Sequence, residues 1–169
     1  MMEWPQSIMI FTVDQKLFGV PLAKLEKILH AQSQVVYPVQ VNLPSLYGYC
    51  QVENDFVPLI DIRILLRKIT VEPTKETSIL VTLINTHLVG LLCDSVRSVI
   101  NPETVLVKLP SPLLLEAKDY FGGVFLHQDE MILLFNPQTL FREGDLHLMA
   151  TTGEHVQQNI TVLDKGSLP

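Results

Sequence analysis

The sequence is poor in cysteine. Cys50 and Cys93 are the only two among 169 residues. A disulfide framework or a thiolate metal site would need more cysteines or closer spacing. Both cysteines lie in apolar, strand-like segments, so we expect two buried free thiols.

Positive charge is also scarce. The chain has 12 Lys and Arg residues against 18 Asp and Glu residues, which gives a net charge of -6. Nucleic acids and anionic membranes are bound through a positive surface. The densest basic cluster is Arg63, Arg67 and Lys68, which is too small for that purpose. We therefore expect no nucleic-acid partner.

No hydrophobic run is long. The longest clean one is Met131 to Phe135, far short of the roughly 20 residues that a membrane-spanning helix needs. The first residues, Met1 to Phe11, have neither a basic n-region nor a long apolar h-region, so we expect no signal peptide. These features predict a soluble, cytoplasmic protein without direct membrane insertion.

Known catalytic motifs are missing from the sequence. It has no G-x-S-x-G elbow, no phosphate-binding loop and no H-E-x-x-H motif. The five histidines are scattered, and two of them fall at predicted turns, where solvated side chains are the rule. A metal site shared by His87, His127 and Asp129 is the less favoured alternative. We expect no enzyme, no cofactor and no bound metal. The histidines are His30, His87, His127, His147 and His155.

What the sequence does contain is a series of short strand patterns. Its length of 169 residues predicts one domain or two small ones, and 47% hydrophobic residues are ample for a core. Polar triplets between apolar runs predict hairpins. Leu22, Leu25, Ile28 and Leu29 have helical spacing, so we expect a short helix from Pro21 to His30. The four predicted turns are Asp14-Gln15-Lys16, Glu53-Asn54-Asp55, Asn85-Thr86-His87 and Gln128-Asp129-Glu130.

The two halves of the chain resemble each other. Gly19 aligns with Gly90, and Gly48 aligns with Gly123, with similar apolar residues around each pair. Two nearly equal offsets in the same order indicate an internal duplication. Each unit has a thin core by itself, so we expect the units to share a hydrophobic interface. The four glycines are expected to be structural, because they allow bends or close backbone approach.

Three segments resemble the CheW family of bacterial chemotaxis adaptors. The first runs from Phe11-Thr12-Val13 through Phe18-Gly19-Val20. The second is Val57-Pro58-Leu59-Ile60-Asp61-Ile62-Arg63. The third begins at Leu88-Val89-Gly90 and continues through Asp94-Ser95-Val96 to Tyr120-Phe121-Gly122-Gly123 and Met131-Ile132-Leu133-Leu134. Order and spacing agree with the family from about Ile8 to Phe141.

The resemblance implies a mainly β fold of two intertwined, five-stranded SH3-like β-barrels with short helices. It places a CheW-like domain at residues 1–142, with subdomains at roughly 12–72 and 77–136. The N-terminal strand and a C-terminal helix complete the barrels, and a polar tail follows at 143–169. It implies no catalysis. The implied partners are the regulatory domain of a CheA-type histidine kinase and the cytoplasmic tip of a methyl-accepting chemoreceptor.

Two charges depart from the family pattern. The family commonly has an N-L-R-G turn where this chain reads Gln51-Val52-Glu53-Asn54, so Glu53 replaces the expected arginine. A glutamate is common where this chain has Lys27. We hypothesise that Lys27 and Glu53 form an ion pair with its charges exchanged. Two unrelated surface charges are the alternative.

The candidate partner-binding or coupling residues are Leu25, Lys27, Ile28, Glu53 and Arg63. Leu25 borders the receptor groove by family position, although core packing also fits it. For Arg63 an ordinary surface or capping contact is the simpler interpretation. Two other functions stay open. One is a regulatory module of the same fold with another partner, in pilus, gliding or another two-component pathway. The other, less favoured, is a small-molecule sensor.

Overall fold

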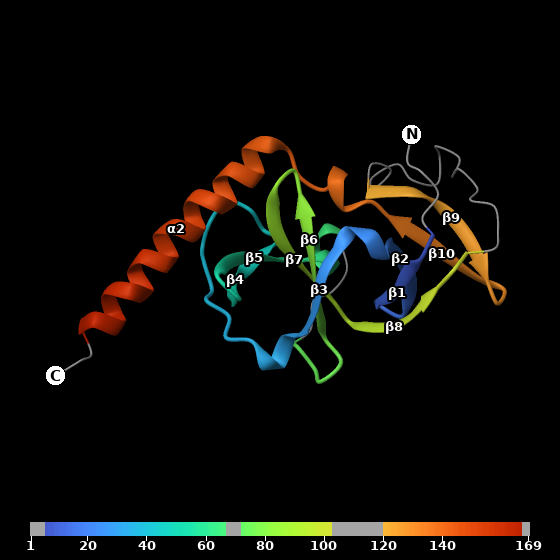
Figure 1. Ribbon diagram of the computed structural model, residues 1–169, viewed down its shortest axis with the longest axis horizontal. Coiled ribbons are helices and arrows are strands. Elements are labelled where there is room, and N and C mark those ends of the chain that lie inside the picture. The colour runs from blue at the N-terminus through green and yellow to red at the C-terminus, as the bar shows by residue number, and fades with distance from the viewer. Residues whose placement is uncertain (1–5, 67–71, 103–119, 167–169) are drawn as a thin grey trace.

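The fold is mainly β and consists of two five-stranded sheets (Figure 1). The computed structural model describes residues 6–66, 72–102 and 120–166, with side chains described as far as residue 163. The predicted fold class is confirmed. Each sheet curls like an SH3 barrel but is not closed, because its two outermost strands are not paired with each other.

Sheet A has the strand order β8-β1-β2-β10-β9. Its strands are β1 (Ile8–Val13), β2 (Lys16–Pro21), β8 (Ser95–Ile100), β9 (Phe121–His127) and β10 (Glu130–Phe135). Sheet B has the order β3-β6-β7-β5-β4. Its strands are β3 (Leu25–His30), β4 (Leu46–Val52), β5 (Asp55–Asp61), β6 (Ser78–Ile84) and β7 (His87–Cys93).

The two sheets repeat one arrangement, which supports the predicted duplication. Each has a single parallel strand pair, β2 with β10 in sheet A and β7 with β5 in sheet B. In both pairs a leucine faces a glycine: Leu134 lies opposite Gly19, and Leu59 lies opposite Gly90. Sheet A takes β1 and β2 from the first half and β8, β9 and β10 from the second. Sheet B takes the complementary strands, so the two repeats are intertwined.

All four predicted hairpin turns are present. Three of them have two consecutive residues with positive φ, as at Asn85 (45°) and Thr86 (75°). Such turns match the right-handed twist of the strands that they join. In the turn between β4 and β5, Glu53 has a φ of 54°.

Apolar side chains form three clusters. One lies within sheet A, with Ile10, Phe125 and Leu134 among its members. A second lies within sheet B and includes Cys50. The third and largest takes residues from both sheets, such as Phe11 of β1 and Leu91 of β7. The expected shared hydrophobic interface between the two units is thus present.

The helix predicted from Pro21 to His30 is wrong. Residues Leu22–Lys24 form a single 3-10 turn, η1, and Leu25–His30 form strand β3. Along β3, half-buried and exposed residues alternate strictly. This period of two identifies a strand at a sheet edge, whereas the leucine and isoleucine spacing alone also fits a helix.

In the part of the chain that the structure describes, the remaining elements are short turns and one long helix. Helix α1 is Ile62–Leu65. Arg67 and Lys68 of the basic cluster lie outside the described residues. Single 3-10 turns occur at Ala31–Ser33 (η2) and Pro137–Thr139 (η5).

The segment expected to be a polar tail is helix α2, Glu143–Gly166. Leu146 and Met149 in its first turns are buried in the cluster between the sheets, and the hydroxyl of buried Tyr49 donates a hydrogen bond to the Met149 carbonyl. Its C-terminal part extends past the sheets (Figure 1). Among the described residues, no helix has the length and apolar character needed to cross a membrane.

Candidate functional site

Three candidate residues lie on β3, which is an edge strand of sheet B. Leu25 is half-buried and packs against the cluster between the sheets. Ile28 is 39% exposed. Leu25 therefore contributes to packing, and Ile28 presents an apolar surface at the sheet edge.

The predicted ion pair between Lys27 and Glu53 is confirmed. The Lys27 Nζ donates a hydrogen bond to the Glu53 carboxylate. This hydrogen bond and the Lys27 charge lower the pKa of Glu53 below its usual value. The Glu53 carbonyl also accepts a hydrogen bond from Gln51 Nε2 at 2.8 Å. Glu53 is thus fixed from two sides at the tip of the β4–β5 hairpin.

Arg63 has a different setting from the other candidates, because it is only 2% exposed. Its Nε lies 2.9 Å from Asp61 Oδ1, and its Nη2 lies 3.0 Å from Asp61 Oδ2. Asp61 Oδ1 also accepts the backbone N–H of Arg63 at 3.0 Å and so caps α1. The hydrogen bonds with Asp61 raise the pKa of Arg63 against the opposing effect of burial. The side chain is buried rather than available at the surface.

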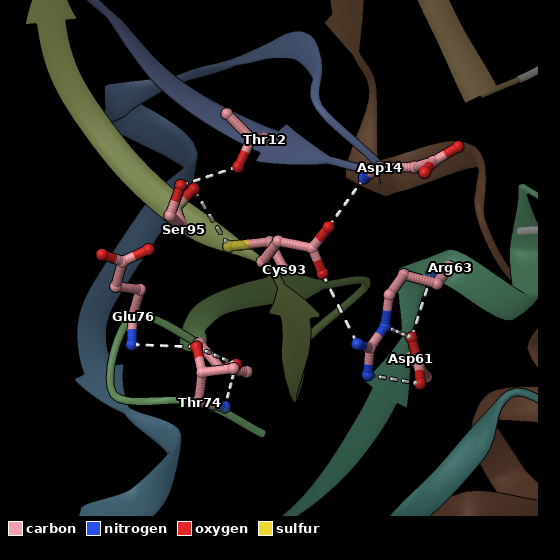
Figure 2. Close-up of polar contacts among 10 residues, drawn as sticks. Thr12, Asp14, Asp61, Arg63, Thr74, Glu76, Cys93 and Ser95 are labelled. Carbon is pink, nitrogen blue, oxygen red and sulfur yellow. Dashed lines mark hydrogen bonds and ion pairs between the residues drawn. The ribbon is translucent and has the colours of Figure 1, made fainter. Parts of the chain in front are cut away.

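Arg63 also takes part in a polar network that links the two sheets (Figure 2). Its Nη1 lies 3.5 Å from Asp94 Oδ1, and the backbone N–H of Asp14 donates to Asp94 Oδ2 at 2.7 Å. Asp94 occupies the crossover between β7 of sheet B and β8 of sheet A. Beside it, the hydroxyl groups of Thr12 and Ser95 are 2.7 Å apart. The network fixes the crossover at the end of β5.

Three of the four glycines named from the sequence have close neighbours. A Cβ atom at Gly19 would lie 2.6 Å from Ile8 Cγ2, one at Gly48 would lie 2.7 Å from the Tyr37 carbonyl oxygen, and one at Gly90 would lie 2.7 Å from Leu59 Cδ2. Gly123 lies on β9, opposite Leu134.

The two cysteines are buried free thiols, as expected. Burial raises the pKa of Cys50 to about 11 and that of Cys93 to about 12. A thiol attacks or binds metal as the thiolate, which such pKa values disfavour at neutral pH. Within the described ranges, no three His, Cys, Asp or Glu side chains cluster as metal ligands do.

A cleft that the sequence analysis did not identify lies between sheet B and α2. Its volume is about 470 Å³. Its residues come from β3, β5, the β6–β7 hairpin and α2, so no local motif marks it. The apolar part of the lining includes Phe56, Val57, Pro58, Leu88, Val89, Met149 and Ala150.

These observations define the class of the protein: a double SH3-like β domain with open sheet edges and a C-terminal helix. Residues 7–145 match the family model of the CheW-like domain. The chain therefore belongs to the CheW-like domain family, which confirms the resemblance found in the sequence.

A solved structure agrees with this fold. The chain is similar to the scaffolding protein TtCheW from Thermoanaerobacter tengcongensis, with a TM-score of 0.74 and 19% sequence identity. The match covers 82% of this chain and 94% of that chain.

Proposed function

We propose that this protein is a non-catalytic cytoplasmic adaptor that couples the cytoplasmic tips of chemoreceptors to the regulatory domain of a CheA-type histidine kinase. The observation that carries the proposal is the CheW-like domain match across residues 7–145. The similarity to a scaffolding protein of the same fold agrees with it. An adaptor needs binding surfaces and no reaction centre.

The open sheet edges offer such surfaces. β3 and β8 are each one of the two edge strands of their sheet, and they expose Ile28 and Val99, the latter by 47%. Main-chain groups at a free edge can pair with an added strand, and exposed apolar side chains add specificity. We assign Leu25, Lys27 and Ile28 on β3, together with the adjoining Glu53, to a partner-contacting edge. Arg63 is instead buried and contacts Asp94 at the crossover between β7 and β8.

A second candidate function is a regulatory module of the same fold in a pilus, gliding or other two-component pathway. The exchanged charges of Lys27 and Glu53 are the observation that favours this alternative function. A partner surface that complements the usual arginine at the hairpin tip would be acidic, and here it would meet the carboxylate of Glu53. Like charges brought together across an interface weaken binding and exclude partners.

Calorimetric titration with a CheA-type regulatory domain from the same organism tests the proposal. Protein concentrations should reach roughly tens of micromolar, because signalling contacts are often modest. We expect saturable binding by the wild type and weaker binding by Ile28→Asp. Val35→Asp is a matched control, because Val35 is an exposed valine in the loop after η2. A parallel titration with a receptor hairpin tip tests the second partner.

The Glu53→Arg variant separates the two candidate functions. Binding by the wild type supports the kinase adaptor. Binding by Glu53→Arg alone indicates an adaptor whose partner carries the complementary charge. If neither protein binds the kinase domain, the proposal fails and the alternative module is favoured.

A further inference from the structure

The cleft between sheet B and α2 is built from parts that are far apart in the sequence. Its floor is the start of β5 and the start of β7, including Phe56, Val57 and Leu88. Met149 and Ala150 in the first turns of α2 form a wall. Buried apolar groups hold that wall in place, together with the hydrogen bond from Tyr49 to Met149. The cleft is therefore a fixed feature of the folded chain, and it exists only while α2 is docked.

The rim of the cleft is acidic. Glu26 from β3 and Asp55 from β5 both line it and are both exposed. In the parts of the chain that the structure describes, neither carboxylate is in an ion pair, and no Lys or Arg lines the cleft. The imidazole of His87 also lines it, and its Nδ1 lies 3.1 Å from the carbonyl of Asn85. The cleft thus combines an apolar floor with negative charge at its opening.

We propose that this cleft binds a short peptide segment of a partner protein, with two or three apolar side chains flanked by Lys or Arg. The volume of about 470 Å³ is in the range of pockets that take small ligands or a few side chains, and it is too small for a whole domain face. The apolar floor favours aliphatic or aromatic anchors, which supply most of the affinity in such sites. The two free carboxylates favour cationic flanks and disfavour phosphate-bearing ligands.

This inference goes beyond the adaptor proposal, because it concerns the cleft between sheet B and α2, to which β3 contributes only Glu26. It needs neither the kinase nor the receptor as the source of the peptide. A failure of the kinase titration therefore leaves it standing, and a failure of the peptide experiment leaves the adaptor proposal standing.

A phage-displayed library of random peptides, selected against the full chain, tests the proposal. Phage that also bind the Ala150→Trp variant are removed first, because an indole at this wall position fills the cleft. We expect enrichment of sequences in which aliphatic or aromatic residues stand next to Lys or Arg. Absence of enrichment, or enrichment of acidic sequences, would overturn the proposal.

One enriched peptide is then synthesised with a fluorophore and titrated by anisotropy. We expect the affinity to fall about tenfold or more for Ala150→Trp and for the Glu26→Lys/Asp55→Lys double variant, since each removes a main component of recognition. The Glu154→Lys variant is the control: it makes the same kind of charge change on an exposed part of α2 that does not line the cleft. Thermal melts show whether each variant is folded. Equal binding by wild type and folded Ala150→Trp would place the peptide elsewhere and refute the assignment.

Discussion

The ammonium group of Lys27 on β3 is paired with the carboxylate of Glu53 at the tip of the β4–β5 hairpin. β3 and β4 are the two edge strands of sheet B, and no backbone ladder joins them. The ion pair therefore joins two parts of the sheet that the hydrogen-bond pattern leaves open. It does so with the charges exchanged relative to the family pattern.

Reversing one charge of this pair should destabilise the protein, and reversing both should restore most of the loss. Lys27→Glu or Glu53→Lys places like charges together, whereas the double variant restores an attractive pair. Urea unfolding of the four proteins gives the coupling directly. Lys24→Glu, the same change at an exposed neighbouring lysine in η1, is the control. Strictly additive losses without recovery would show that the pair contributes nothing.

The same pair predicts an acid dependence. The folded state lowers the pKa of Glu53, so the unfolded state takes up a proton first as the pH falls. The stabilisation is complete above the ordinary glutamate value of 4.5 and is lost as the pH falls below it. The difference in melting temperature between wild type and Lys27→Met should shrink over that range. A constant difference down to low pH would contradict this.

Replacement of Gly48 by alanine is predicted to destabilise the protein. A Cβ atom there would lie 2.7 Å from the backbone carbonyl oxygen of Tyr37, and Tyr37 forms a β-bridge with Tyr49 that this contact would disturb. Gly48→Ala should therefore lower the free energy of unfolding by about 1–3 kcal/mol, as overpacking does.

Gly144→Ala is the opposite control. Nothing lies within 4 Å of a Cβ atom at that position in α2, so Gly144→Ala should not lower the free energy of unfolding. A stabilising Gly48→Ala would mean that the Tyr37 segment moves freely.

Removal of the Arg63 side chain should be among the most destabilising single changes. Arg63→Met leaves the carboxylate of Asp61, which is 1% exposed, buried without a cation. Breaking a buried pair in this way costs roughly 3–5 kcal/mol. Arg97→Met on the exposed outer face of β8 is the matched control. Adding Asp61→Asn to Arg63→Met should recover part of the loss, because it removes the charge and retains a helix-capping group. No recovery would assign the loss to packing alone.

The fold could be predicted because its signals are local or repeated. The four polar turns set the hairpins, and the pairing of Gly19 with Gly90 in the alignment reflects two equivalent parallel strand pairs. The β3 error has a physical cause: Leu22, Leu25, Ile28 and Leu29 fit a helical face as well as an edge strand. Only the pairing of β3 with β6, about 50 residues away in the chain, decides between them.

The site was harder to predict than the fold. Lys27 and Glu53 could be paired because family comparison suggested two compensating departures. The burial of Arg63 and the cleft beside α2 could not be predicted, because both depend on how distant segments pack. Residues 143–166 are polar on average, and the apolar positions that dock the helix, such as Leu146 and Met149, lie within one short stretch near its start.

Tyr49→Phe is expected to loosen α2 without disturbing the sheets. The change deletes the buried hydrogen bond to Met149, which should cost about 0.5–1.5 kcal/mol, and hydrogen exchange should quicken in the first turns of α2 but not in β6 or β7. Burial also raises the pKa of Tyr49 to about 12 from 10.0. The folded state therefore retains the phenol proton longer than the unfolded state, so the tyrosine's contribution is complete below pH 10 and declines as the pH rises to about 12. The phenylalanine variant lacks this alkaline decline. Equal exchange in α2 for both proteins would show that packing of Leu146 and Met149 alone holds the helix.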